Sequence, residues 1–149
     1  MTLRERLGGV AGVWVGTYTH LSPDGAVLER FASRQETRLR GDRWYERIVY
    51  RHPDGRSEAL DFRAGFDATG ERMIFDDPRF HGEAFPLGED VLVFPYHWKD
   101  RPDRRTVETV VFSSADRRSR VWQTFEGGEL ARVTVIVERR VPEEPAEWE

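Results

Sequence analysis

Apolar and polar residues alternate along most of this chain, and short turn signals interrupt the alternation at regular intervals. Runs rich in Val, Thr, Tyr, Phe and Trp lie between turns that contain Gly, Pro or Asp. The turns are Ser22-Pro23-Asp24-Gly25, Gly41-Asp42, Pro53-Asp54-Gly55, Ala68-Thr69-Gly70, Pro86-Leu87-Gly88 and Gly127-Gly128. Consecutive hairpins of this kind predict an all-β fold. We expect an antiparallel up-and-down β-barrel of about eight to ten strands, a size that can enclose a small molecule.

The two ends of the chain do not follow this alternation. Residues 1–9 predict a short N-terminal helical segment with Leu3 and Leu7 on one side, which would cap one end of the barrel. Residues 142–149 are rich in Pro and Glu and predict a flexible tail. No repeat or linker divides the 149 residues, so we expect a single domain over 1–149.

The tight turns also predict which residues lie opposite each other, because a two-residue loop fixes the register of a hairpin. The Gly41-Asp42 turn places Leu39 opposite Trp44 and Thr37 opposite Glu46. The next turn places Glu46 opposite Phe62. The other face of these segments is rich in arginine and must face water, so the face that includes Trp14 is predicted to be the inside.

The later strands continue this pattern. The aromatic face of Leu92, Phe94, Tyr96 and Trp98 is predicted to point inward. The Gly127-Gly128 turn predicts that Trp122 pairs with Val133 and Arg120 with Val135. Both faces of residues 131–141 are partly apolar, and we assign Val133, Val135 and Val137 to the inside because theirs is the more apolar face.

Composition narrows the classes of function. Aromatic residues make up 12% of the chain, which favours a folded globule, and the net charge of −4 argues against a nucleic-acid partner. There is no cysteine, so thiol chemistry and disulfides are excluded. The sequence has no apolar run of about 20 residues and no apolar signal core near its start, so we expect no membrane partner and a cytoplasmic location.

Gly12-Val13-Trp14 opens the first predicted strand after the short helical segment. It resembles the G-x-W signature of lipocalins and related calycin barrels. The whole chain, through Arg120-Val121-Trp122 to Glu138-Arg139, also resembles a bacterial lipocalin-like family of unknown function that is distantly related to the phycobilin-lyase barrels. The resemblance implies ligand binding. It also implies structural roles for Gly12 and Trp14, and for Arg139 or Arg140 as a late basic residue that packs over the tryptophan.

The predicted inner face combines aromatic side chains with buried polar groups. The candidate ligand-binding residues are Tyr18, Phe31, Ser33, Gln35, Trp44, Glu46, Tyr50, Phe62, Phe94, Tyr96, Trp98, Glu108, Arg120 and Trp122. Such a lining suits a small, flat hydrophobic or aromatic molecule with an acidic or polar end. Arg120 is the predicted contact for that end and the natural partner of Glu46 or Glu108. The alternative is a filled core in which these groups only pair with one another.

A second hypothesis is a cofactor-independent cyclase or isomerase. Its catalytic residues would be Glu46 as general acid or base, with Tyr50 or Arg120 stabilising developing negative charge. No nucleophile, phosphate-loop or dinucleotide motif is present in the sequence, and we expect no cofactor.

A metal site is not expected. His81, Glu83 and His97 could come together, but they lie on the face opposite to the predicted interior and match no ligand motif.

A third hypothesis is an interaction module. Homodimer formation would use apolar outer positions, for which Val13, Val15, Val91 and Val93 are the candidates.

Overall fold

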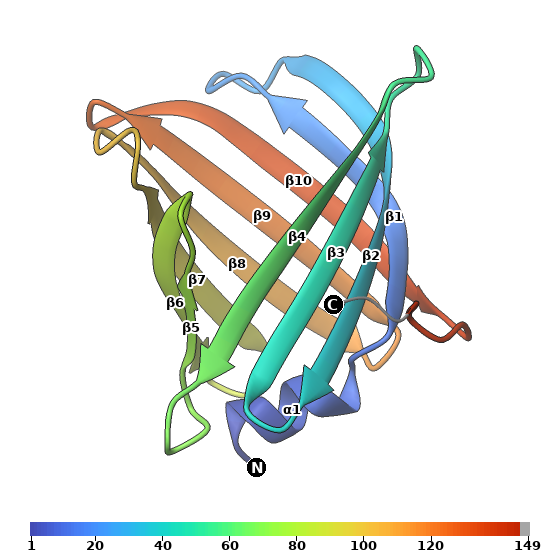
Figure 1. The fold of residues 1–149 in the computed structure, drawn as a ribbon. Coiled ribbons are helices and arrows are strands. Elements are labelled where there is room, and N and C mark those ends of the chain that lie inside the picture. The colour runs from blue at the N-terminus through green and yellow to red at the C-terminus, as the bar shows by residue number, and fades with distance from the viewer. Residues whose placement is uncertain (147–149) are drawn as a thin grey trace.

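The hairpins close into one barrel. In the computed structural model, which describes residues 1–146, ten antiparallel strands follow one short helix. Each strand pairs with its sequence neighbours, and β1 also pairs with β10, which closes the barrel (Figure 1). The elements are α1 (Leu3–Gly9), β1 (Val13–Leu21), β2 (Val27–Arg40), β3 (Arg43–Arg51), β4 (Ser57–Phe66), β5 (Met73–Asp76), β6 (Phe80–Leu87), β7 (Val91–Trp98), β8 (Arg104–Ser114), β9 (Arg117–Glu126) and β10 (Glu129–Val141). The predicted all-β up-and-down barrel with a short N-terminal helix is confirmed.

The predicted register of the first strands is also confirmed. Leu39 pairs with Trp44, Thr37 pairs with Glu46, and Glu46 pairs with Phe62. The β2–β3 turn is tight because Gly41 adopts a φ of 60°, a left-handed conformation that glycine reaches without strain. No register shift follows the β2–β3 or β3–β4 turn, so the inner face is carried across these strands.

The predicted inner face of β10 is wrong. Trp122 pairs with Thr134, and Arg120 pairs with Ile136, one position away from the predicted partners. The register shifts between Leu130 and Arg132, where a β-bulge adds a residue to β10. Because side chains alternate between faces, this one residue exchanges the inside and the outside of the strand.

The consequence is visible in burial. Thr134 and Ile136 are fully buried and Glu138 is 2% exposed, whereas Val137 is 60% exposed. The three valines that we predicted inside therefore lie on the outer face, and β10 contributes a threonine, an isoleucine and a carboxylate to the interior.

α1 lies across one end of the barrel (Figure 1). Its first turn is fixed by a capping box, in which the backbone N–H of Glu5 donates to Thr2 Oγ1 at 3.2 Å and that of Thr2 donates to Glu5 Oε2 at 2.8 Å. Leu3 and Leu7, on one side of the helix, are 2% and 6% exposed and join the core cluster that includes Trp44. Burial of these leucines holds the helix against the barrel end.

Trp14 lies in this closed region and is fully buried. Its indole N–H donates to the Val10 carbonyl at 3.0 Å. The guanidinium carbon of Arg118 lies 4.3 Å from the centroid of the Trp14 ring, a cation–π contact. The basic residue over the tryptophan is therefore Arg118 and not Arg139, whose side chain is exposed on β10.

Gly12 precedes Trp14 with a φ of 148° and is tied to β2 on both sides. Its N–H donates to Thr37 Oγ1 at 3.0 Å, and its carbonyl accepts from the Thr37 backbone N–H at 2.8 Å. These bonds fix the direction in which the chain enters β1.

The structure does not show the expected apolar outer face, and it describes only part of the expected C-terminal tail. Val13 is fully buried, and Val15, Val91 and Val93 are half-buried, so these positions do not form the exposed apolar face that we expected. Residues 147–149 of the expected tail lie outside the described residues. Within the described part, the Ala146 N–H donates to Glu36 at 3.1 Å, and the flexibility of the tail stays a prediction.

The described part of the chain contains no helix that is long and apolar enough to cross a membrane.

Candidate functional site

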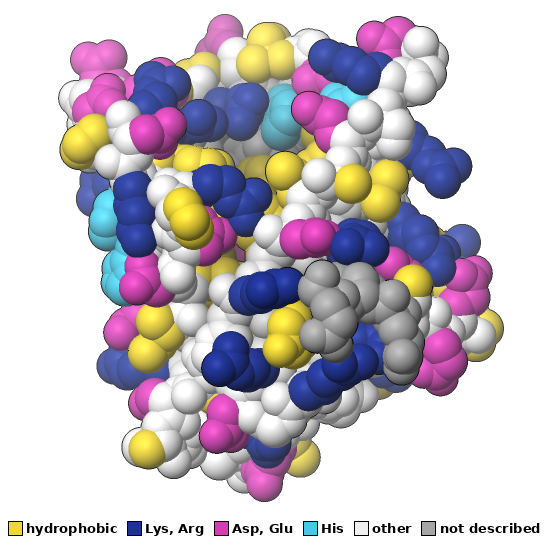
Figure 2. Space-filling model, viewed as in Figure 1, with side chains coloured by type: hydrophobic (Ala, Val, Ile, Leu, Met, Phe, Trp, Pro, Cys, Tyr) yellow, Lys and Arg dark blue, Asp and Glu magenta, His cyan; other side chains and the backbone are white. Residues whose placement is uncertain are grey.

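The barrel encloses a cavity of about 410 Å³ that runs from α1 to the opposite end of the strands. Leu7 of α1 lies at its closed end. The other end is lined by charged side chains from the strand ends, and Figure 2 shows the surface hollowed there between arginine and histidine side chains. We call this open end the mouth; its residues are His20, Glu29, His52, Arg56, Glu58, Arg104 and Arg132.

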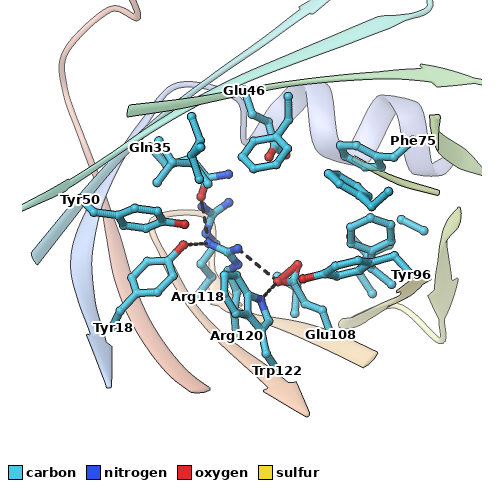
Figure 3. Close-up of a pocket in the computed structure, with 18 of the residues that line it drawn as sticks. Tyr18, Gln35, Glu46, Tyr50, Phe75, Tyr96, Glu108, Arg118, Arg120 and Trp122 are labelled. Carbon is cyan, nitrogen blue, oxygen red and sulfur yellow. Dashed lines mark hydrogen bonds and ion pairs between the residues drawn. The ribbon is translucent and has the colours of Figure 1, made fainter. Parts of the chain in front are cut away.

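One wall of the cavity is aromatic and comes from β4 to β8. Phe75 and Phe94 have ring centroids 4.7 Å apart, and Phe94 and Tyr96 are 4.8 Å apart. Phe80 lies 5.2 Å from Tyr96 and 5.8 Å from Trp98. All five rings line the cavity, and Figure 3 shows Phe75 and Tyr96 on one side of it, so the wall presents a broad apolar surface to anything held there.

The facing side holds a buried network of charged groups. Arg120 is its centre: one Nη donates to Glu108 at 3.1 Å, and the other donates to Gln35 at 2.9 Å and to Glu138 at 3.2 Å (Figure 3). Arg118 donates to Glu138 at 2.9 Å and to the same Gln35 oxygen at 2.8 Å. Two guanidinium groups thus meet two carboxylates, and the network is neutral as a whole.

The network sets the charge states of its members. Burial alone would raise the pKa of Glu138, but Arg118 and Arg120 outweigh burial and lower that pKa. Burial disfavours the charged form of Arg120, yet Glu108, Tyr18 and Glu138 more than offset it and raise the pKa of Arg120 well above its usual value. Both groups are therefore charged at neutral pH.

The two phenols beside the network are neutral. The Tyr18 hydroxyl accepts a hydrogen bond from Arg120 at 3.1 Å, and its ring stacks on Phe31 at 5.3 Å. Tyr50 meets the Tyr18 ring edge-on at 5.0 Å. Burial raises the pKa of both tyrosines, so at neutral pH they offer hydroxyl groups and not phenolates.

Glu46 differs from the other interior carboxylates because no arginine forms an ion pair with it among the described contacts. Its one hydrogen bond comes from the Trp44 indole N–H at 2.7 Å. Burial raises the pKa of Glu46, which favours the protonated acid. The sequence prediction that Arg120 pairs with Glu46 or Glu108 resolves in favour of Glu108.

The mouth has two chemically different sides. On the side of β2 to β4, His52 bridges Glu29 at 2.8 Å and Glu58 at 3.2 Å. Nearby, His20 Nδ1 lies 2.8 Å from Thr134 Oγ1, and burial lowers the pKa of His20 to about 4, so its ring is neutral. On the side of β8 to β10 lie Arg104 and Arg132.

The structure brings together nearly all of the candidate ligand-binding residues. Those that line the cavity are Tyr18, Phe31, Gln35, Trp44, Glu46, Tyr50, Phe62, Phe94, Tyr96, Trp98, Glu108, Arg120 and Trp122. Ser33 is the exception, because it is buried opposite Gly16 in the wall and is not a lining residue. The alternative of a filled core does not hold, since these side chains surround a cavity of about 410 Å³.

Several lining residues escaped the sequence analysis. Arg118 lies two residues before Arg120 on the same strand, so the alternation of side chains could have identified it as an inward-facing residue. Arg104 likewise shares the face of Glu108. The bulge in β10 hid the lining residue Arg132, and also Glu138 of the buried network, because the side of the strand on which they lie cannot be counted from the turn.

The outer histidines do not belong to this cavity. His81 and His97 pair across β6 and β7 with ring centroids 5.7 Å apart, and the His81 side chain is 43% exposed. Among residues 1–146, no group of three or more His, Asp or Glu side chains is placed to hold a metal ion.

Comparison with known proteins agrees with this architecture. Residues 4–143 match the family model described as "Domain of unknown function (DUF3598), N-terminal". No curated protein matches the sequence. A protein of unknown function from the DUF3598 family of Nostoc punctiforme has a TM-score of 0.73 and 17% identity, and the match covers 89% of this chain and 48% of that one. The chain therefore spans about half the length of that relative.

Two further structures share the fold over nearly their whole length. The S-type phycobiliprotein lyase CPES from Guillardia theta has a TM-score of 0.76 and 10% identity, with 97% of this chain and 95% of that chain covered. Rv2717c from M. tuberculosis has a TM-score of 0.63 and 13% identity, with 95% and 98% covered. The expected resemblance to phycobilin-lyase barrels is confirmed at the level of fold.

Proposed function

The chain belongs to the family of DUF3598 N-terminal domains, and from that premise and the geometry of its barrel we propose that it binds a small, flat hydrophobic molecule with a polar or acidic end. The observation that carries the proposal is the cavity of about 410 Å³ between an aromatic wall and a neutral polar network. Ligand cavities are typically about 300–1,000 Å³, mostly apolar, with a few polar groups that fix orientation.

The lining supports a flat ligand in particular. Phe75, Phe94 and Tyr96 follow one another at centroid distances of 4.7 and 4.8 Å. Rings at these distances give a wall on which an aromatic or conjugated molecule can pack by stacked or edge contacts. Tyr18 and Tyr50 offer neutral hydroxyl groups, and Glu46 a carboxyl group whose pKa is raised by burial, on the facing side, where a polar group of the ligand would be held.

Fluorescence titration with the neutral probe N-phenyl-1-naphthylamine tests this proposal. The probe is expected to bind with energy transfer from the interior tryptophans. Leu92→Trp fills the cavity from the inner face of β7 and should weaken binding at least about tenfold. Val93→Trp, on the outer face of the same strand, is the matched control and should bind as the native chain does. Equal affinities in both variants, or no binding by the native chain, would refute the proposal.

A second candidate is the cofactor-independent cyclase or isomerase, and Glu46 is the observation that favours it. A buried carboxyl with a raised pKa that faces a ligand cavity is suited to proton transfer. The phycobiliprotein lyase CPES, which shares the fold with a TM-score of 0.76, is named as an enzyme, and this also supports an enzymatic function. Tyr50 or Arg120 would stabilise developing negative charge.

Glu46→Gln separates the two candidates. The variant should abolish turnover of a substrate found for this chain while the affinity for N-phenyl-1-naphthylamine stays unchanged. Full activity in the variant would remove Glu46 from the mechanism. Cytoplasmic location and self-association stay predictions, and light scattering of the protein in solution measures the latter.

A further inference from the structure

The mouth contains buried hydrogen-bond donors that the protein itself does not satisfy. Arg104 Nε, Arg132 Nε and Trp98 Nε1 are all buried, line the cavity and have no hydrogen-bond partner among the described residues. Buried N–H groups are nearly always paired, because desolvation without a partner costs free energy. Three unsatisfied donors at one end of one cavity therefore require an explanation.

The three donors lie on neighbouring strands and form a cluster. Arg132 of β10 and Thr106 of β8 both pair with Thr124 of β9, and Arg104 lies two residues before Thr106 on the same face. The guanidinium carbon of Arg104 is 5.0 Å from the Trp98 ring centroid. The donors thus converge on one side of the mouth, above the aromatic wall.

The charge around this cluster is positive. Glu126 is its nearby carboxylate, with an oxygen 3.3 Å from Arg101 and 3.8 Å from Arg104. Arg132 has no ion pair among the described contacts. Burial lowers the pKa of Arg132 by disfavouring its charged form, and repulsion from the neighbouring Arg104 lowers that pKa further. An anion between the two arginines would relieve this repulsion.

The rest of the cavity is less suited to an anion. Arg120, the residue we expected to hold an acidic end, already faces Glu108 and Glu138 and is neutralised by them. The opposite side of the mouth carries Glu29 and Glu58, which would repel a negative group. The cationic donors that lack a hydrogen-bond partner are at the mouth: Arg104 Nε has an ion pair with Glu126 that is too long for a hydrogen bond, at 3.8 Å, and Arg132 has no ion pair among the described contacts.

We propose that Arg104, Arg132 and Trp98 form an oxyanion subsite that holds the carboxylate or phosphate end of the ligand at the mouth, with its apolar body on the aromatic wall. The inference rests on the proposed ligand-binding function and deepens it. Arginine forks match carboxylate and phosphate oxygens, and such charge-assisted bonds are among the stronger hydrogen bonds in proteins.

A pair of probes that differ only in an anionic group tests the subsite. 8-Anilinonaphthalene-1-sulfonate carries a sulfonate, and N-phenyl-1-naphthylamine has the same rings without it. Arg104→Gln and Arg132→Gln should each weaken the sulfonate probe about tenfold or more and change the affinity for the neutral probe less than about twofold. Trp98→Phe removes the indole N–H together with part of the ring surface, so it should weaken the sulfonate probe more than the neutral probe.

Arg105→Gln is the matched control, because Arg105 is the next residue on β8 and is exposed on the outer face. It removes the same charge and should leave both probes unaffected. Displacement of the neutral probe by 1-naphthoate and by 1-naphthyl phosphate then distinguishes the two oxyanions: the better competitor identifies the group that the subsite prefers.

The outcomes separate this inference from the function it rests on. If the neutral probe binds but the arginine variants leave the sulfonate probe unchanged, or weaken both probes equally, the subsite is refuted and the ligand-binding proposal stands. If neither probe binds the native chain, both fail. Failure of both naphthyl anions to displace the neutral probe also overturns the subsite.

Discussion

Replacing Glu138 by glutamine should strongly destabilise the barrel. Glu138 is 2% exposed and accepts hydrogen bonds from Arg118 at 2.9 Å and from Arg120 at 3.2 Å. Glutamine keeps an acceptor oxygen and nearly the same shape but removes the charge. Arg118 would then lose its carboxylate partner, and Arg120 would keep Glu108 alone.

The magnitude follows from burial. Removing one partner of a buried ion pair costs about 3–5 kcal/mol, because the remaining charge stays desolvated without compensation. For a chain of this size, such a loss lowers the melting temperature by roughly 10 °C or more. Urea unfolding followed by tryptophan fluorescence and circular dichroism measures the free energy of unfolding, with thermal unfolding as a second reading.

Asp61→Asn is the matched control. It removes one carboxylate charge from the Arg47–Asp61 pair, whose atoms are 2.7 Å apart but whose Asp61 side chain is 51% exposed. Solvent screening limits such a pair to about 0–1 kcal/mol. A loss in Glu138→Gln no larger than that in the control would refute the reasoning, since it would mean that the interior network is not desolvated.

The pH dependence has a definite sign. The pKa of Glu138 is lowered from 4.5 in the folded state by Arg118 and Arg120 against the effect of burial. Its stabilisation is therefore present above pH 4.5 and is lost as the pH falls through the folded-state pKa. The difference in unfolding free energy between the native chain and Glu138→Gln should narrow on acidification; a constant difference would contradict this assignment.

Three further changes probe other parts of the fold. Glu46→Gln should gain stability relative to the native chain as the pH rises above 4.5, because burial raises the pKa of Glu46 and makes its deprotonation destabilising. Urea unfolding at several pH values measures the difference in unfolding free energy between the two proteins. A difference that does not change with pH would contradict this prediction. Gly16→Ala should cost about 1–3 kcal/mol or more, since its Cβ would lie 2.1 Å from the Val137 carbonyl oxygen, whereas Gly9→Ala meets no atom within 4 Å; equal melting temperatures would be evidence against this clash. Leu7→Ala should cost about 2–5 kcal/mol through the cavity it leaves under α1, and unchanged urea unfolding would show that the helix adds no stability.

Much of the barrel could be predicted from sequence because local signals agree with the global fold. The turns at 41–42 and 53–55 are short, so they fix which residues oppose each other without information from elsewhere in the chain. Glu46, Tyr50 and Phe62 were assigned to the interior on that ground, and all three line the cavity.

The inward face of β10 could not be predicted from local sequence. The bulge between Leu130 and Arg132 adds one residue after a turn that looks as tight as the others, and nothing in the composition of residues 129–141 identifies it. Which face of β10 points inward depends on the burial of Thr134, Ile136 and Glu138 against the rest of the closed barrel. A choice between two partly apolar faces is made by packing and not by alternation.

Local sequence signals were enough to predict an antiparallel barrel, a helix at one end of it, and an aromatic interior in the early strands. The cavity inside the barrel and the pairing of its buried charges depend on contacts between distant parts of the chain. Arg120 finds Glu108 twelve residues away but also Glu138, whose side chain points inward through the bulge. The β8–β9 and β9–β10 pairings place Arg104 and Arg132 on the two strands that flank β9, on the same side of the mouth. Pairing across strands is a long-range property, so only the folded barrel reveals which charges are neutralised and which remain available to a ligand.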